Sequence, residues 1–155
     1  MKCKSVSAVL ASLFALGLVV SAATASYAED DGCSLARSAG KYAFTDSGTV
    51  IGIGPRTAVG VVTLDGAGNV INSSATSSLN GNIAVETFTG TYTVNSDCTT
   101  TFSVKIYASG VEILDLTMSG AFDDHMKEIR ALFTSVTTPT GTVLPTVVNL
   151  VARKQ

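Results

Sequence analysis

The sequence predicts an all-β domain folded as an eight-stranded antiparallel up-and-down barrel. Apolar and polar residues alternate with a period of two along most of the chain, and Thr and Val are frequent in these segments. Turn sequences such as Asp65-Gly66 and Asn80-Gly81 separate the segments, as is typical of hairpins. Closing such a meander removes its two free edges, which favours a barrel. A β-sandwich has similar strand spacings and is the alternative.

The first four expected strands follow one another through tight turns. Residues 40–45 alternate aromatic and polar side chains, and the Gly-rich stretch 48–55 connects them to the strand 57–64. This second strand ends at the Asp-Gly turn, after which the third strand, 69–76, runs towards the Asn-Gly turn. The fourth strand, 86–94, alternates aromatic residues, Gly and Val with four Thr residues.

The last four expected strands show the same alternation. Residues 100–107 and 111–118 flank a Ser-Gly turn, and a polar connection rich in Asp separates them from 127–136. A Thr-Pro-Thr-Gly turn leads to the final strand, 142–152, in which Pro145 marks a bulge or an edge.

Residues 1–28 are predicted to be a secretory signal peptide. Lys2 and Lys4 precede an uncharged stretch, 6–23, and small residues then allow cleavage after Ala25 or Ala28. The alternative is an uncleaved anchor helix, since the apolar stretch approaches the length needed to span a bilayer. Cleavage after Ala28 leaves one domain, 29–155, exported to the periplasm or secreted.

The exported domain has a composition that excludes several functional classes. Removing 28 of 155 residues leaves 127, and the loss of two Lys leaves eight basic against 12 acidic residues, a net charge of −4. This balance excludes binding to nucleic acid by bulk charge, and the 46% hydrophobic content of the full 155-residue chain excludes wholesale disorder. An outer-membrane barrel is rejected because the outer faces of 86–94 and 100–107 carry Thr, Ser and Lys. The domain is therefore not expected to span a membrane.

Two cysteines remain after the signal is removed. Cys33 and Cys98 are expected to form a disulfide in an exported chain, next to a short helical turn within 31–38. The alternatives are free thiols or a metal site, but His125 is the only histidine and too few ligands are present for structural zinc. No metal and no cofactor are predicted.

Several segments resemble a group of small exported bacterial proteins with no established role. They are 40–44 (GKYAF), 59–61 (VGV), 65–69 (DGAGN), 90–94 (GTYTV) and 97–98 (DC). The architecture that they suggest is similar to the allene oxide cyclase-like barrels of the calycin type. Relatives of this barrel type include cyclases and proteins that bind small apolar molecules. None of their catalytic residues can be matched to a position in this sequence.

The catalytic residues expected of common hydrolases are also missing. A Ser-His-acid triad would have to use His125, which lies beside two aspartates in an expected loop, and no Gly-x-Ser-x-Gly motif is present. The sequence therefore favours a non-catalytic role and leaves the catalytic residues unassigned.

Aromatic residues on the expected inner face form the candidate ligand site. Tyr42, Phe88 and Tyr92 share this face with Phe102, and the alternative is that they only fill the core. Buried tyrosine hydroxyls need hydrogen-bonding partners, which a ligand would supply.

Two charged residues complete this candidate site. Glu112 falls on the face of the leucines in 111–118, and Arg130 on the neighbouring strand is expected to pair with it. One interpretation is an ordinary salt bridge at the end of a strand, and the other is that the pair orients the polar end of a ligand.

The favoured function is an exported barrel that binds a small apolar molecule in its interior. The alternatives are a structural or interaction protein of the cell envelope without a ligand, and a cyclase-like enzyme that acts by positioning its substrate. The strands 57–64 and 142–152 are apolar on both faces, which predicts a homo-oligomer that covers the outer face.

Overall fold

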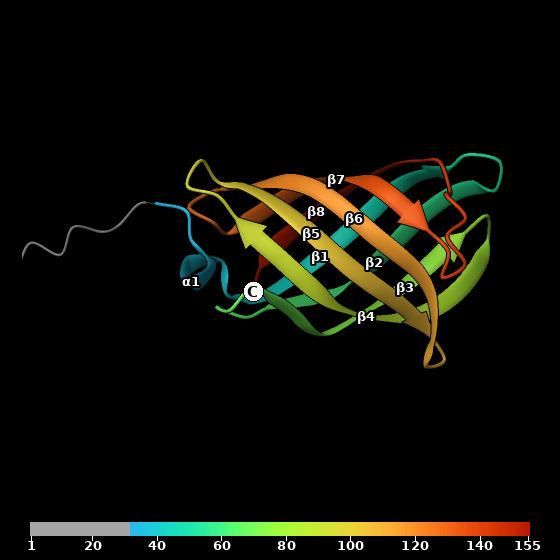
Figure 1. Ribbon diagram of the computed structural model, residues 1–155, viewed down its shortest axis with the longest axis horizontal. Helices are drawn as coiled ribbons and strands as arrows, with labels where there is room; N and C mark the ends of the chain where they lie inside the picture. Colours follow the sequence, from blue (N-terminus) through green and yellow to red (C-terminus); the bar gives the residue numbers. More distant parts are fainter. Residues whose placement is uncertain (1–31) are drawn as a thin grey trace, which may run out of the picture.

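The computed structural model describes residues 32–155, which form one short helix and a closed eight-stranded barrel (Figure 1). The barrel prediction is confirmed, and the β-sandwich alternative is wrong. The predicted signal peptide and both candidate cleavage points lie outside the described residues. Within residues 32–155, no helix is long and apolar enough to cross a bilayer. The elements are α1 (Leu35–Ser38), β1 (Gly40–Val50), β2 (Gly54–Leu64), β3 (Asn69–Leu79), β4 (Asn82–Val94), β5 (Thr99–Ala108), β6 (Val111–Asp123), β7 (Glu128–Thr137) and β8 (Thr146–Lys154).

Antiparallel pairing of the first and last strands closes the barrel. Each strand pairs with its neighbours in the sequence, and β1 also pairs with β8. Thr45 of β1 thus lies opposite Val59 of β2 on one side and Val151 of β8 on the other. Closure satisfies the backbone groups that a free edge would leave unpaired.

Most strands differ in length from those expected: β3 ends at Leu79 rather than at 76, β4 begins at Asn82 rather than at 86, and β6 ends at Asp123 rather than at 118. Two further differences change the path of the chain. The stretch 48–55 is mostly strand, because Gly48 pairs with Arg56 and Val50 pairs with Gly54, which leaves only a tight hairpin between β1 and β2. The last strand begins at Thr146 rather than at residue 142. The carbonyl of Pro145 accepts a hydrogen bond from Ile51 N at 2.8 Å, so the chain before β8 joins the end of β1 instead of extending the strand.

Inward-facing glycines allow adjacent strands to approach closely. A Cβ atom placed on Gly48 would lie 2.6 Å from Val148 Cα, and one on Gly90 would lie 2.7 Å from Val104 Cα. Both distances are shorter than any real Cβ contact of this kind, so a side chain would force the strands apart. Glycine at these positions lets the strands bend tightly around a narrow interior.

Two buried tyrosines close the end of the barrel next to α1. The Tyr42 hydroxyl donates to the carbonyls of Ser38 and Met126, at 2.7 and 3.1 Å. The Tyr92 hydroxyl donates to the carbonyl of Asp65 and shares a 2.9 Å hydrogen bond with Ser38 Oγ. These contacts join α1 to the β2–β3 and β6–β7 turns. Burial raises the pKa of Tyr42 to about 12 and also raises that of Tyr92, so both remain hydroxyls.

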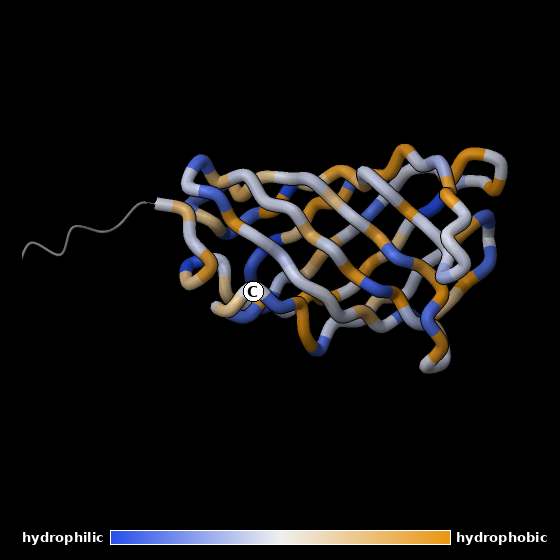
Figure 2. Tube along the Cα trace, in the orientation of Figure 1, coloured by the Kyte–Doolittle hydropathy of each residue, from blue (hydrophilic) through white to orange (hydrophobic). Residues whose placement is uncertain are grey.

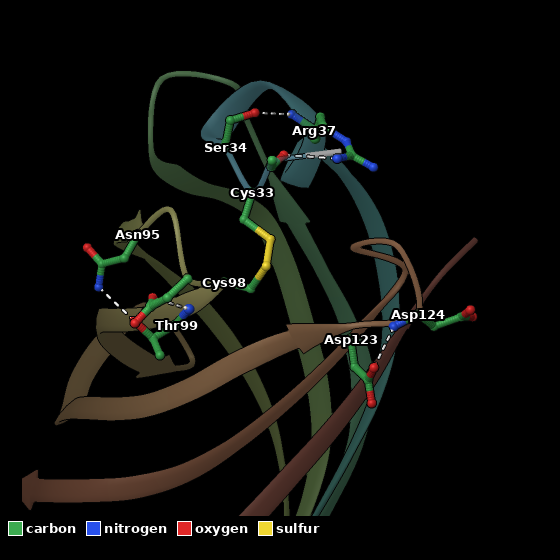
Figure 3. Close-up of a disulfide and its surroundings, with 10 residues drawn as sticks. Cys33, Ser34, Arg37, Asn95, Cys98, Thr99, Asp123 and Asp124 are labelled. Carbon is green, nitrogen blue, oxygen red and sulfur yellow. Dashed lines mark hydrogen bonds between the residues drawn. A yellow bond between two sulfur atoms is a disulfide. The ribbon is translucent and has the colours of Figure 1, made fainter. Parts of the chain in front are cut away.

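The predicted disulfide between Cys33 and Cys98 is confirmed (Figure 3). It joins the residue before the N-cap of α1 to the turn between β4 and β5, with the two Cα atoms 5.0 Å apart. Ser34 caps α1, since its Oγ accepts a hydrogen bond from Arg37 N at 3.4 Å. The disulfide therefore fixes the helix across the same end of the barrel that the tyrosines close.

Replacing Gly90 with alanine is expected to lower the free energy of unfolding by about 1–3 kcal/mol, because the added methyl overlaps β5. Urea unfolding followed by circular dichroism measures this change. Gly66→Ala is the matched control, since its Cβ would meet only Ala36 Cα, at 3.9 Å. Equal stability of the two variants would contradict the close approach of β4 and β5.

Candidate functional site

The barrel interior contains two adjacent cavities. The first, of about 50 Å³, is bordered by Phe88 and Phe102 of the predicted site. Apart from Asp46, Arg56 and Glu86, every residue that lines it is apolar. The second cavity, of about 60 Å³, lies towards the end opposite α1 and is also bordered by Arg56. A single water molecule needs roughly 10–15 Å³ of cavity volume. Each cavity therefore has room for a group larger than one water molecule.

A buried ionic cluster lies between the two cavities. The Arg56 guanidinium donates to both carboxylate oxygens of Glu86, at 3.3 and 3.1 Å, and to Asp46 Oδ2 at 3.3 Å. Ser77 Oγ donates to Glu86 Oε1 at 2.7 Å. The side chains of Asp46, Arg56 and Glu86 are only 2%, 7% and 5% exposed. Two carboxylates thus share one guanidinium within the barrel.

The cluster leaves part of its hydrogen-bonding capacity unused. Within residues 32–155, Asp46 Oδ1 and Arg56 Nε are the buried side-chain polar atoms without a partner. Burial raises the pKa of the Asp46 carboxyl, and the nearby Arg56 charge offsets this only in part. Burial also disfavours charge on Arg56, but its hydrogen bonds and its two carboxylate neighbours raise its pKa overall. Arg56 therefore remains charged, and its stronger pairing is the two-point contact with Glu86.

Four consecutive strands bring this cluster together. Asp46, Arg56, Ser77 and Glu86 come from β1, β2, β3 and β4 and face inward with the core residues of those strands. Ala58 lies opposite both Asp46 and Ser77, and Ala75 lies opposite Glu86. These small residues leave room for the longer charged side chains, which is why the cluster fits inside a narrow barrel.

This cluster was not predicted from the sequence, although the period-two alternation places its three charged residues on inner faces. Asp46 continues the inward face of Phe44, Arg56 that of Ala58, and Glu86 that of Phe88. The first expected strand stopped one residue before Asp46, and the second began one residue after Arg56. Extending the first two expected strands by one residue places Asp46 and Arg56 on inner faces, and Glu86 already begins the fourth expected strand on its inner face.

Tyr42 and Tyr92, both predicted to contact a ligand, border neither cavity. Their hydroxyls already have protein partners at the closed end of the barrel. Tyr92 stacks on Phe102 with ring centroids 5.7 Å apart, so the closed end is packed directly against the first cavity. The tyrosines therefore stabilise the closed end of the barrel. This agrees with the alternative that they pack in the core rather than contact a ligand.

The expected pairing of Glu112 with Arg130 is wrong, because Arg130 lies opposite Ala121, at the other end of β6 from Glu112, and both side chains lie on the outer wall. In β6 a bulge leaves Ile113 without a partner, so Glu112 lies opposite Tyr107 while Leu114 lies opposite Ile106. Glu112 instead accepts hydrogen bonds from Lys105 Nζ at 2.9 Å.

Arg130 does not lie on the inner face of β7, contrary to expectation. Ile129, Ala131 and Phe133 are buried there, which turns Arg130 outward. Arg130 is 66% exposed and donates to Glu128 at 2.7 Å. It therefore contributes to the surface and has no contact with the cavities.

The remaining polar candidates do not form a catalytic or metal site. His125 lies exposed in the β6–β7 turn, outside the barrel interior. No group of three or more His, Cys, Asp or Glu residues in the described part of the chain is arranged to hold a metal ion. The interior cluster contributes two carboxylates, both of which contact Arg56.

Comparison with known structures shows the same fold in designed proteins. The redesigned β-barrel mFAP1, solved bound to DFHBI, is 13% identical, with a TM-score of 0.50 over 78% of this chain and 98% of that chain. EF1p2_mFAP2b bound to DFHBI is 12% identical, with a TM-score of 0.55 over 79% of this chain and 100% of that chain. No protein-family model and no curated protein sequence matches this chain. At this identity the similarity establishes the barrel fold alone.

Asp46→Asn is expected to change how stability depends on pH. The folded protein retains a proton on Asp46 at pH values where the unfolded chain, with a pKa near 3.8, has released it. The stability of the wild-type protein relative to the variant should therefore fall as pH rises above about 4. Urea unfolding at pH 4, 5, 6 and 7 measures this difference.

Asp124→Asn is the control for this series, because it removes a carboxylate from the exposed β6–β7 turn without touching the interior. A wild-type protein that gains stability relative to Asp46→Asn as pH rises would show that the Arg56 charge outweighs burial.

Proposed function

We propose that this protein is a non-catalytic barrel that binds a small, mainly apolar molecule with one polar group. The observation that carries the proposal is the first cavity, whose walls are apolar except for the cluster of Asp46, Arg56 and Glu86. Small-molecule sites combine apolar walls with a few convergent polar groups, but sites for drug-sized ligands measure roughly 300–1,000 Å³, so the ligand of a cavity of about 50 Å³ must be small. The apolar part of the ligand would lie against Phe88 and Phe102, and its polar group would face the cluster.

The structural neighbours support this proposal by analogy. The designed barrels mFAP1 and EF1p2_mFAP2b were solved with DFHBI, so this architecture accommodates a small molecule. The relation to allene oxide cyclase-like barrels is a further proposal, and cyclase-like activity has no assigned catalytic residue. The apolar walls of the cavity and the pairing of both cluster carboxylates with Arg56 support binding rather than catalysis.

Export is part of the proposed function. The Cys33–Cys98 disulfide supports it, since disulfides form and persist in oxidising compartments such as the periplasm or the extracellular space. An exported binding protein would meet its ligand outside the cytoplasm.

A neutral apolar probe tests the proposed binding site. We expect 1-hexanol to bind the wild-type protein, and Ala131→Leu to weaken this binding at least about tenfold, because the longer side chain fills the first cavity. Isothermal titration calorimetry measures both affinities. Ala121→Leu adds the same volume on the exposed face of β6 and should leave the affinity unchanged. Equal affinities for the two variants would place the site outside this cavity.

We also infer that the barrel forms a homo-oligomer through the outer face of β2, β1 and β8. Val59 and Val147 are 57% and 64% exposed there, and Val151 is partly exposed beside them. Because β1 pairs with both neighbours, Thr45 joins Val59 and Val151 into one apolar strip on the outer wall. A second copy of the chain would cover this strip and exclude water from it.

The combined change Val59→Ser and Val147→Ser is expected to shift the protein from oligomer to monomer, as measured by sedimentation velocity at micromolar concentration. Val111→Ser is the control, because Val111 is equally exposed but begins β6 at the end of the barrel. A wild-type protein that sediments as a monomer would overturn the inference and remove support from an interaction role in the envelope.

A further inference from the structure

We propose that the ligand class is an amphiphilic amine, whose ammonium group binds Asp46 while its hydrocarbon part occupies the first cavity. This inference rests on the proposed binding function and specifies its polar group. It is carried by two observations on the same site: the excess negative charge of the buried cluster, and the carboxylate oxygen in it that has no partner.

The charges in the cluster do not balance. Asp46 and Glu86 contribute two carboxylates, and Arg56 contributes one guanidinium. Of the residues that border the two cavities, no other is charged. With both carboxylates ionised, the cluster has a net charge of −1, and burying an uncompensated charge is costly. A single cationic group on the ligand neutralises the cluster.

The unused hydrogen-bonding capacity places that group on the Asp46 side. Glu86 accepts three side-chain hydrogen bonds, two from Arg56 and one from Ser77, whereas Asp46 accepts one side-chain hydrogen bond, through Oδ2, and a backbone contact from Ala58. Asp46 Oδ1 is buried without a partner, and the residue borders the first cavity. An ammonium group would donate a charge-assisted hydrogen bond to this oxygen.

Two other polar groups fit the site less well. An alcohol would donate to Asp46 Oδ1 and accept from Arg56 Nε, but it would leave the charge of −1 uncompensated. A carboxylate would accept from Arg56 Nε but would add a second uncompensated negative charge next to Asp46 and Glu86. Charge balance therefore favours the amine, although Arg56 Nε would gain no acceptor from it.

The bound amine and a proton should compete for Asp46. The charged groups that face Asp46 are Arg56 from β2 and Glu86 from β4, while β3 contributes Ser77 and β8 presents only apolar residues to the first cavity. Since burial raises the pKa of Asp46, some of this carboxyl binds a proton at mildly acid pH. Amine binding should therefore weaken as pH falls and should release a proton.

Three probes with the same hydrocarbon chain test the inference: hexylamine, 1-hexanol and hexanoate, each titrated by calorimetry at pH 7. We expect hexylamine to bind at least about tenfold more tightly than 1-hexanol, because it adds one charge-assisted hydrogen bond, and hexanoate to bind most weakly. Asp46→Asn should reduce hexylamine affinity to that of 1-hexanol and leave 1-hexanol binding within about threefold. Glu112→Gln is the matched control, since it removes a carboxylate from the outer wall, where Lys105 binds it.

The outcomes separate the inference from the proposed function. If 1-hexanol or hexanoate binds as tightly as hexylamine, the amine inference is overturned while the binding function stands. If none of the three binds, the proposed function itself fails. Should Asp46→Asn not fold, wild-type titrations in two buffers of different ionisation enthalpy at pH 5 decide the question: release of a proton on hexylamine binding supports the inference, and no release overturns it.

Discussion

The pairing of β1 with β8 is the constraint on which the rest of this structure depends. It turns an up-and-down meander into a closed surface with a distinct inside, so inward-facing side chains must find all their partners within the barrel. The close strand approaches at Gly48 and Gly90 keep that interior narrow. A narrow, closed interior has little water, and any charge that faces it interacts strongly with its neighbours.

This closure gives the Asp46–Arg56–Glu86 cluster its significance. Replacing a buried ion pair with apolar residues of similar volume is often neutral or stabilising, so such a cluster is weak evidence of a purely structural role. Here the surrounding wall is already apolar, and leucine or methionine would fit it without a charge imbalance. Asp46 is the member with the weaker pairing to Arg56 and a raised pKa. These features fit the ligand recognition that we propose better than a purely stabilising role.

The sequence predicted the strands well because alternation and turn chemistry are local signals. The disulfide could also be predicted from the sequence, since only two cysteines follow the predicted signal peptide. The charged site was not predicted because Asp46 and Arg56 lie just beyond the expected ends of their strands. The stretch 48–55 between them was expected to be a connection, whereas its residues pair as part of β1 and β2. Glu112 was misplaced for a different reason. The bulge at Ile113 changes which face Glu112 points to, and a bulge depends on the partner strand rather than on the alternation within β6.

The two ends of the barrel differ in how firmly they are closed. At the α1 end, opening would break the hydrogen bonds of Tyr42 and Tyr92, and the Cys33–Cys98 disulfide would limit how far α1 could move. At the opposite end the hairpins have exposed aliphatic side chains, including Ile51, Ile53 and Val111. Figure 2 shows orange, hydrophobic stretches of the chain in the hairpins at this end.

The second cavity lies beneath these hairpins and shares Arg56 with the first. Within residues 32–155 the hairpin end has no disulfide, so local opening there breaks no covalent bond, whereas the Cys33–Cys98 disulfide and the tyrosine hydrogen bonds oppose the displacement of α1. For the ligand that we propose, exchange would therefore favour the hairpin end, and its polar group would approach the cluster past Arg56. An amine that enters with its hydrocarbon part first would place that part in the first cavity and leave its ammonium group at the cluster without turning. The two-point contact holds Arg56 against Glu86, which leaves Asp46 as the carboxylate with an unpartnered oxygen for the ammonium group.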